Sequence, residues 1–304
     1  MVIFDTRTIL PDQQNSFSIQ HRDHQHGTPT GSHQTLIGSS FFISEFQLHL
    51  LHPKQGSFSQ HLALQYPGFC GHTGIITRLR RFIITVKIDW TNIDTVLLDM
   101  DGTLLDLHFD NYFWLTHLPR RYAEHHGVCP DQATKDLHNR FNEKRGTLDW
   151  YCLEFWSKEL ALNIRELKEE VEHLIVERPF VQEFLTQLGE EGTQRVLITN
   201  AHPQSLELKL SLTGIGPLLD HIYTSHQFGH PKESSNFWYA LKQQQHFDPQ
   251  RTLFIDDSLE VLKAAKNYGI GHLLGISQPD SKQQDRQING FPSIQHFNEI
   301  FPHG

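Results

Sequence analysis

Cysteine is scarce in this chain. Among its 304 residues only Cys70, Cys129 and Cys152 are cysteines, and no two of them have CxxC spacing. Three thiols cannot all pair with one another, so a disulfide framework is not indicated. We therefore expect reduced thiols in a cytoplasmic protein.

Basic residues and long apolar runs are also in short supply. The chain has 26 Lys and Arg against 35 Asp and Glu, and its formal net charge of −9 disfavours a nucleic-acid binder, because phosphate backbones attract clustered positive charge. The stretch LIGSSFFISEFQLHLLH is interrupted by Glu45 and is too polar to span a bilayer. The N-terminus lacks the basic start and clean apolar segment of a signal peptide. We expect neither a membrane nor a nucleic acid as partner.

The first 85 residues differ in texture from the remainder. They are rich in Gln, His, Ser and Gly, and they carry four acidic and six basic residues, which leaves the rest of the chain with a net charge of −11. Their poor hydrophobic periodicity predicts a low-complexity or disordered leader. A solvated polar segment explains its clustered histidines more simply than a metal site does: His21, His24, His26 and His33.

From about Lys87 onward, apolar strands alternate with amphipathic segments, which is the pattern of an α/β protein. We predict a mostly helical region over 111–188 and helices from Glu233 and over 259–267, the last one closed by Gly269. The predicted strands are 94–99, RVLITN, 221–224, TLFIDD and 272–274. In PQSLELKLSLTG the alternating leucines favour a strand, whereas the flanking Pro203 and Gly214 favour a helix. Spacing alone leaves both possibilities open.

Three of the predicted strands end in polar side chains, in LLDMD, LITN and LFIDD. Ligands of open α/β sheets bind at the carboxyl ends of the strands. Asp99 and Asp101 are two residues apart, so they face the same side of an extended chain, and Asp256 and Asp257 arrive on another strand. Carboxylates so close together need a positive partner, most simply Mg²⁺.

Thr199 adds a hydroxyl donor to this group, and Lys232 in GHPKE adds a positive charge. Hydroxyl, ammonium, metal and carboxylate together suit a phosphoryl group, which gains charge in its transition state. One aspartate can attack phosphorus while the other transfers a proton. Each motif also has a simpler explanation, such as a hairpin turn for Asp-Gly, a helix cap for Thr-Asn or a solvated helix start for Pro-Lys-Glu. Four of them in a fixed order are difficult to explain by chance.

The motifs DMDGT, LITNAH, GHPKE and FIDDS together resemble motifs one to four of the haloacid dehalogenase-like (HAD) hydrolase superfamily. A denser similarity, which runs from about Asp89 to the C-terminal region and includes LDWYCLEFWS, resembles the purine 5′-nucleotidases of that superfamily that act on IMP and GMP. The resemblance implies an α/β fold for residues 86–304, with a Rossmann-like parallel sheet core and a helical cap inserted after the first strand at about 108–180. It also makes 203–213 a helix.

This resemblance implies a role for each motif residue. Asp99 would be the nucleophile that forms an aspartyl-phosphate, and Asp101 would be the general acid and base. Thr199 would hydrogen-bond the phosphoryl oxygens, and Lys232 would neutralise the nucleophile and the phosphate. Asn200 is a further candidate for substrate binding, although it could equally satisfy backbone groups.

The resemblance also implies a metal site and a branch of the superfamily. Mg²⁺ would bind Asp99, the backbone carbonyl of Asp101, and Asp256, with Asp257 in support. Haloacid dehalogenases lack an acid at the position of Asp101 because their leaving halide needs no proton, so this residue favours a phosphatase. The phosphonatase branch would need a Schiff-base lysine in the cap, and the sequence alone identifies none.

The expected substrate is a small phosphate monoester. Seven aromatic residues of the cap could stack on a purine, but core packing is the simpler explanation for each of them: Phe109, Tyr112, Phe113, Trp114, Trp150, Tyr151 and Trp156. A preference for IMP and GMP therefore rests on the family resemblance. The alternatives are a sugar-phosphate phosphatase or phosphomutase, and a non-catalytic nucleotide-binding scaffold, which has no need of the complete motif set.

The start of the family resemblance bears on the leader. It begins near VKIDWTNIDTVLLD, and the only methionines are Met1 and Met100, which lies inside the first motif. We expect the first 85 residues to be a disordered leader or an over-extended gene prediction, with a non-AUG start such as Val86, and to be dispensable for catalysis.

Overall fold

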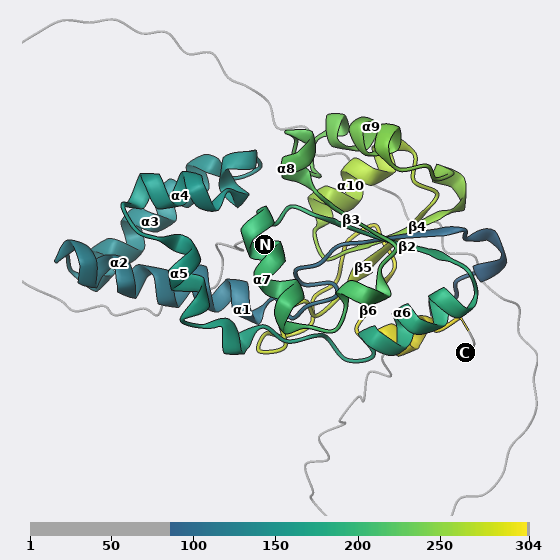
Figure 1. Ribbon diagram of the computed structural model, residues 1–304, viewed down its shortest axis with the longest axis horizontal. Helices are drawn as coiled ribbons and strands as arrows, with labels where there is room; N and C mark the ends of the chain where they lie inside the picture. The colour runs from purple at the N-terminus through teal and green to yellow at the C-terminus, as the bar shows by residue number, and fades with distance from the viewer. Residues whose placement is uncertain (1–85, 303–304) are drawn as a thin grey trace, which may run out of the picture. The chain divides into compact units, whose positions relative to one another are not determined.

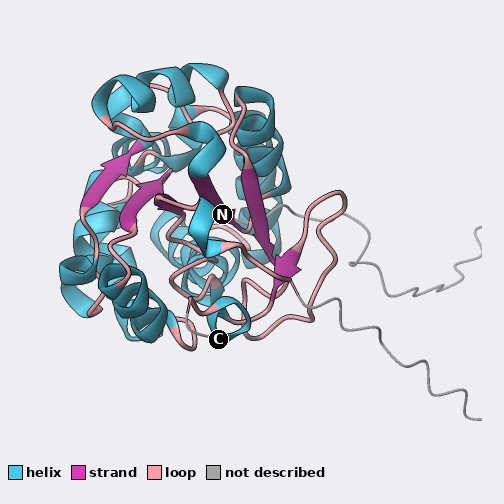
Figure 2. Cartoon of the chain, turned by 90° about the vertical axis from the view of Figure 1, so that its right-hand side faces the viewer, coloured by secondary structure: helices cyan, strands magenta, loops and turns pink. Residues whose placement is uncertain are grey.

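The computed structural model describes residues 86–302, so the expected leader, its histidines and Cys70 lie outside the described residues. In the described part, parallel strands form one sheet in the order β3-β2-β1-β4-β5-β6, with helices on both of its faces (Figures 1 and 2). The expected α/β fold with a Rossmann-like parallel sheet is therefore confirmed. The strands are β1 (Thr95–Leu98), β2 (Gln194–Thr199), β3 (His221–Thr224), β4 (Thr252–Asp256), β5 (His272–Ile276) and β6 (Ser293–Ile294).

The central strand β1 is buried throughout because helices cover the sheet on both faces. Leu98 belongs to a hydrophobic cluster with Phe184 of helix α6 (Val181–Glu190), whereas Leu97 belongs to a second cluster with Trp238 of helix α9 (Ser235–Gln244). The neighbours β2 and β4 pair with β1 in parallel register. The carboxyl ends of all three central strands therefore meet at one edge of the sheet.

The helices of the core follow sequence signals that are easy to recognise. In α6 the buried residues recur at helical spacing, and α10 ends at Gly269, whose φ of +110° favours glycine. These helices are α6 (Val181–Glu190), α7 (Pro203–Leu212), α8 (Ser225–Phe228), α9 (Ser235–Gln244) and α10 (Leu259–Tyr268). Short 3-10 turns, among them η7 (Phe297–Ile300), complete the packing.

A separate group of helices follows β1 and lies beside the sheet in Figure 1. Its own core is aromatic: Trp156 packs edge-to-face on Phe141 and Trp114. The sequence inserts these helices between β1 and β2, where the cap is expected. They are α1 (His108–Tyr112), the π-helical turn η2 (Phe113–His117), α2 (Leu118–His126), α3 (Pro130–Lys144), the 3-10 turn η3 (Leu148–Tyr151), α4 (Leu153–Leu160) and α5 (Ile164–Glu169).

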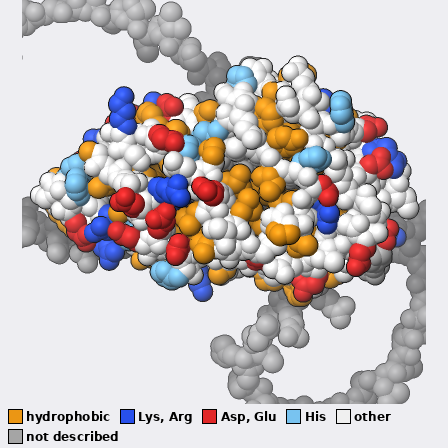
Figure 3. Space-filling model, viewed as in Figure 1, with side chains coloured by type: hydrophobic (Ala, Val, Ile, Leu, Met, Phe, Trp, Pro, Cys, Tyr) orange, Lys and Arg blue, Asp and Glu red, His pale blue; other side chains and the backbone are white. Residues whose placement is uncertain are grey.

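Helix α7 is the segment whose alternating leucines were ambiguous. It begins with Pro203 at its first turn, and His202 Nδ1 accepts the Gln204 N–H as a cap. Its buried residues are Ser205 and Lys209, one turn apart, while its leucines lie on the flanks and pack only partly. In the view of Figure 3, apolar side chains gather in the middle of the molecular surface, in the region where Figure 1 shows α7. The alternation misleads because the buried face of this helix is polar.

The described residues also bear on membrane-spanning helices and on disulfides. None of the helices within residues 86–302 combines the length and apolarity that crossing a bilayer requires. Within the described residues Cys129 and Cys152 form no disulfide, and Cys70 lies outside them.

Candidate active site

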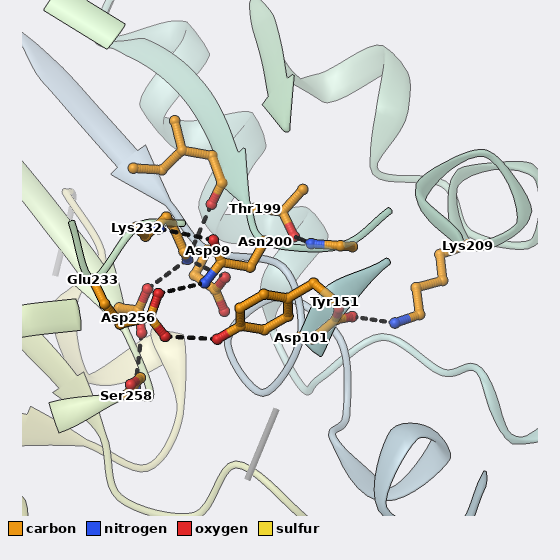
Figure 4. Close-up of polar contacts among 12 residues, drawn as sticks. Asp99, Asp101, Tyr151, Thr199, Asn200, Lys209, Lys232, Glu233, Asp256 and Ser258 are labelled. Atoms are coloured by element: carbon orange, nitrogen blue, oxygen red, sulfur yellow. Dashed lines mark hydrogen bonds and ion pairs between the residues drawn. The ribbon is translucent and has the colours of Figure 1, made fainter. Parts of the chain in front are cut away.

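Asp99 follows β1 directly, and its N–H donates to the Ile255 carbonyl of β4 over 3.0 Å. Lys232, from the loop between α8 and α9, donates from Nζ to Asp99 Oδ1 over 2.5 Å and to Asp256 Oδ2 over 2.7 Å (Figure 4). It also donates to the Ile198 carbonyl over 3.2 Å. Lys232 is only 2% exposed, which rules out the solvated helix start as an explanation for Pro-Lys-Glu.

The charges around Lys232 are unbalanced. Oxygens of Asp99, Asp256 and Asp257 lie within 4.8 Å of one another, and all three residues are buried. Burial raises the pKa of Asp256 to about 8. Burial opposes the charge on Lys232, but the two carboxylates outweigh it and raise the pKa of this lysine. Lys232 and, at Asp257, Arg286 are two cationic groups against three carboxylates, and this oxygen-only donor set fits a hard divalent cation such as Mg²⁺.

Asp257 is held against the turn that follows Asp99. Arg286 Nη2 donates to its carboxylate over 3.1 Å and to its carbonyl over 2.7 Å. Gly102 in that turn has a φ of +91°, and a Cβ there would lie 2.9 Å from Asp257 Cγ. Only glycine fits this position without moving Asp257, so the Asp-Gly pair has a specific structural role rather than that of a hairpin turn.

The side chain of Asp101 turns away from the carboxylate cluster. Its Oδ1 accepts from Lys209 Nζ over 2.6 Å (Figure 4), and the same ammonium group donates to Asp110 Oδ2 over 2.6 Å. Asp110 Oδ1 in turn accepts from Lys168 of α5 over 2.8 Å. A buried chain of alternating charges therefore links Asp101 to the cap.

This chain sets the protonation of its members. Burial raises the pKa of Asp101, and Lys209 only partly opposes this shift. Burial alone would also raise the pKa of Asp110, but Lys168 and Lys209 outweigh it and hold that pKa well below its ordinary value. The two pKa shifts have opposite directions, so Asp101 gives up its proton at a higher pH than Asp110 does.

Sequence reasoning missed Lys209, Asp110 and Lys168. Lys209 could have been found if the segment after LITN had been taken as a helix. Ser205 and Lys209 are one turn apart, so they lie on the same face of that helix. The sequence alone identified no cap lysine of the kind that phosphonatases need, but the cap does contain a buried lysine at the cavity, Lys168. Its ion pair with Asp110 accounts for its position.

The two polar residues of the LITN motif, Thr199 and Asn200, make different contacts. Thr199 is buried, and its hydroxyl oxygen accepts the Ala201 N–H over 2.9 Å, which leaves the hydroxyl hydrogen free to donate to a ligand. Asn200 accepts the Lys232 N–H over 2.9 Å and donates to Glu233 over 3.0 Å. Asn200 therefore satisfies a backbone group and fixes the loop that carries Lys232.

A contact between cap and core lies directly over these residues. The Tyr151 hydroxyl, from η3, donates to Glu233 Oε1 over 2.6 Å (Figure 4). Burial, together with the nearby Glu233 carboxylate, raises the pKa of Tyr151 well above its ordinary value, so the phenol keeps its proton. The Glu233 carboxylate also accepts a hydrogen bond from the Asn200 amide, so one carboxylate joins the cap to the loop that carries Lys232.

A cavity between cap and core contains the sequence-predicted catalytic groups Asp99, Asp101, Thr199 and Lys232 in its wall, together with Asn200, Asp256 and Asp257. Of the cap aromatics, only Trp114 and Tyr151 line it. The core-packing explanation holds for the buried remainder: Phe109, Phe113, Trp150 and Trp156. The other cavity residues include Asp110, Leu153, Lys168, His202 and Ser205.

Comparisons with known proteins agree with this geometry. A family model described as a haloacid dehalogenase-like hydrolase matches residues 93–269. The GMP/IMP nucleotidase YrfG of Escherichia coli is 42% identical over 217 residues, which cover 71% of this chain and 98% of that protein. The pyrophosphatase PpaX of Bacillus velezensis is 26% identical, over 58% of this chain and 80% of its own length.

Two solved structures share the fold. A HAD phosphatase from Thermococcus onnurineus has a TM-score of 0.58 at 23% identity, covering 68% of this chain and 95% of its own. The magnesium-bound HAD hydrolase YfnB of Bacillus subtilis has a TM-score of 0.50 at 22% identity, covering 68% and 96%. The chain belongs to the haloacid dehalogenase-like hydrolase family and is a phosphoric monoester hydrolase.

Proposed function

We propose that this enzyme hydrolyses purine nucleoside 5′-monophosphates, IMP and GMP first among them, to nucleoside and phosphate through an aspartyl-phosphate on Asp99. The observation that carries the chemistry is the buried Lys232 between Asp99 and Asp256, in a cavity that Asp101 also lines. The similarity to a GMP/IMP nucleotidase over 98% of its length supports the choice of substrate.

In the first step Asp99 attacks phosphorus. Its Oδ1 is engaged by Lys232, which leaves its second oxygen to form the new bond. The bond from phosphorus to the 5′-oxygen breaks, and Asp101 gives its proton to that oxygen. Thr199 donates its free hydroxyl hydrogen to a phosphoryl oxygen, and Lys232 offsets the charge that develops.

In the second step Asp101, now ionised, takes a proton from water as the water oxygen attacks phosphorus. The bond between phosphorus and Asp99 breaks, phosphate leaves, and both aspartates return to their starting state. When bound, Mg²⁺ supplies positive charge to the phosphoryl oxygens and to the carboxylates around them. Asp99, Asp256 and Asp257, whose carboxylate oxygens lie within 4.8 Å of one another, would hold it together with the backbone carbonyl of Asp101.

Recognition of the nucleoside falls to the cap side of the cavity. Trp114 and Tyr151 offer aromatic faces there, and Tyr151 is held in place by its bond to Glu233. We also propose a cytoplasmic location, which the free thiols of Cys129 and Cys152 support.

The test is phosphate release with Mg²⁺ across IMP, GMP, AMP, their deoxy forms and sugar phosphates, with Asp99→Asn in parallel. We expect preference for IMP and GMP, and loss of activity with EDTA or with the substitution. Turnover of sugar phosphates alone would overturn the substrate. Interconversion of phosphate isomers without net release would indicate a mutase, and no turnover of any compound would indicate a binding scaffold.

A further inference from the structure

A second group of metal-ligating side chains lies where the cap meets the core, outside the carboxylate cluster. Cys152 precedes α4 in the cap, whereas His202 and His226 come from the starts of α7 and α8 in the core. One ligand atom from each of the three lies within 4.8 Å of the others. Glu154, in the first turn of α4, contacts His202 Nε2 through its carboxylate.

His226 is already in the form that binds a metal. The Thr224 hydroxyl donates its hydrogen to the Ala201 carbonyl over 2.7 Å, so towards His226 Nδ1, 3.4 Å away, its oxygen can only accept. Nδ1 therefore carries the ring hydrogen, and Nε2 keeps a free lone pair. This Nε2 is buried and has no hydrogen-bond partner in the described part of the chain. A buried lone pair without a donor is costly, and a cation would satisfy it.

The other members are held in place by local structure. His202 is buried, caps α7 and packs its ring edge-to-face on His226 at 4.9 Å between centroids. The Cys152 sulfur accepts the Phe155 N–H over 3.4 Å as the cap of α4 and lies 3.6 Å from Glu154 Oε2. Helix starts thus fix the positions of both histidines and of the cysteine.

We propose that Cys152, His202 and His226, with Glu154 as fourth ligand, form a Zn²⁺ site that ties the cap to the core. Thiolate and imidazole ligands favour Zn²⁺, whereas the oxygen-only cluster in the active site favours Mg²⁺. Around tetrahedral Zn²⁺ the ligand atoms are about 3.5 Å apart, so the present separations need to contract by about 1 Å.

Binding redistributes two protons. The Cys152 thiol releases its proton to solvent and becomes the thiolate ligand. His202 moves its ring hydrogen from Nε2 to Nδ1 and gives up the 3.3 Å contact with the Gln204 N–H. Glu154 exchanges its contact with His202 for the metal. The bound ion would then hold the start of α4 against α7 and α8, beside the cavity that His202 also lines.

Co²⁺ is the probe for this site, because a tetrahedral cobalt–thiolate site has characteristic d–d and charge-transfer bands. The full-length protein, with excess Mg²⁺ to fill the carboxylate cluster, should develop these bands with one equivalent of Co²⁺, and Zn²⁺ should displace it. Cys152→Ala should lose the charge-transfer band, and His226→Gln should weaken binding by more than about 100-fold. The control variants Cys70→Ser and Cys129→Ser should titrate as the wild type does.

The tie between cap and core has its own readout. Backbone amide exchange in α4 should slow when Zn²⁺ is added to the wild type, and should not respond in Cys152→Ala. Absence of the band in the wild type, its survival in Cys152→Ala, or equal affinity in His226→Gln would overturn the site. Unchanged exchange in α4 would overturn the tie. Neither measurement requires turnover, so failure here is distinct from failure of the proposed function.

Discussion

Lys209 of α7 places one ammonium group 2.6 Å from Asp101 and 2.6 Å from Asp110. Asp101 sits in the turn after Asp99, whereas Asp110 belongs to the first cap helix and is held by Lys168. The protonation of Asp101 is thereby coupled to a buried network that includes the cap. The first two predictions test this network.

Lys209→Met should move the pH optimum of hydrolysis to higher pH. Lys209 lowers the pKa of Asp101, against the stronger effect of burial that raises it. Without the ammonium group the pKa of Asp101 rises further. The first step needs Asp101 protonated and the second needs it ionised, so the alkaline limit of the first step and the acid limit of the second both move to higher pH. Profiles of kcat against pH measure this shift. Lys263→Met, which removes an exposed lysine, is the control, and an optimum unchanged or shifted to acid in Lys209→Met would contradict the coupling.

Asp110→Asn should destabilise the fold in a manner that depends on pH. The folded-state pKa of Asp110 is depressed below the value of about 3.9 in an unfolded chain. Its contribution is therefore fully present above about pH 4 and is lost as the pH falls further. We expect a loss of about 3–5 kcal/mol near neutral pH, because two buried lysines lose a partner. Urea unfolding across pH measures the difference, with the exposed Asp131→Asn as control; a difference that does not change with pH would contradict the assignment.

Gly102→Ala should impair catalysis more than it impairs folding. Both Gly102 and Gly127 have positive φ, so alanine costs about 1–2 kcal/mol of backbone strain at either position. Only at Gly102 does the added Cβ meet Asp257, whereas nothing lies within 4 Å at Gly127. Displacing Asp257 should lower kcat by about 100-fold. Thermal unfolding and kinetics of the two variants side by side decide this, and equal activities would contradict the role given to Gly102.

Tyr151→Phe should weaken closure of the cap while keeping its aromatic ring. The variant removes the hydrogen bond to the Glu233 carboxylate, worth about 1.5–3 kcal/mol because one partner is charged. We expect kcat/KM for IMP to fall by about 10-fold or more. Tyr239→Phe, at a tyrosine that is 61% exposed, is the matched control. A kcat/KM equal to that of the wild type would show that this contact does not hold the cap closed.

The sequence predicts the sheet and the clustering of the motif residues at its edge, because both depend on local patterns. The apolar residues 96–98 of β1 are followed directly by Asp99, and the parallel arrangement brings the ends of β2 and β4 beside it. Helix α7 is different, since its buried face carries Ser205 and Lys209 and its leucines lie at the flanks. A hydrophobic pattern reports burial only when the buried surface is apolar, so a polar face built for the active site inverts it.

Residues that act across the boundary between cap and core could not be found by spacing. Tyr151 and Glu233 are 82 residues apart, and Asp110 and Lys209 are 99 apart. Neither pair belongs to a local motif. The cap aromatics are a second example. Their number suggests a purine site, but only the fold shows that Trp114 and Tyr151 line the cavity, whereas the buried Phe109, Phe113, Trp150 and Trp156 do not.

The central claim is that Asp99 carries the phosphoryl group between the two steps. The direct measurement is an acid quench of the wild-type enzyme during turnover of IMP with Mg²⁺, followed by mass analysis of its peptides. We predict one phosphoryl group on the peptide that contains Asp99, which disappears when the substrate is exhausted and never forms in Asp99→Asn. Continued phosphate release by Asp99→Asn, without any such adduct in the wild type, would contradict the account.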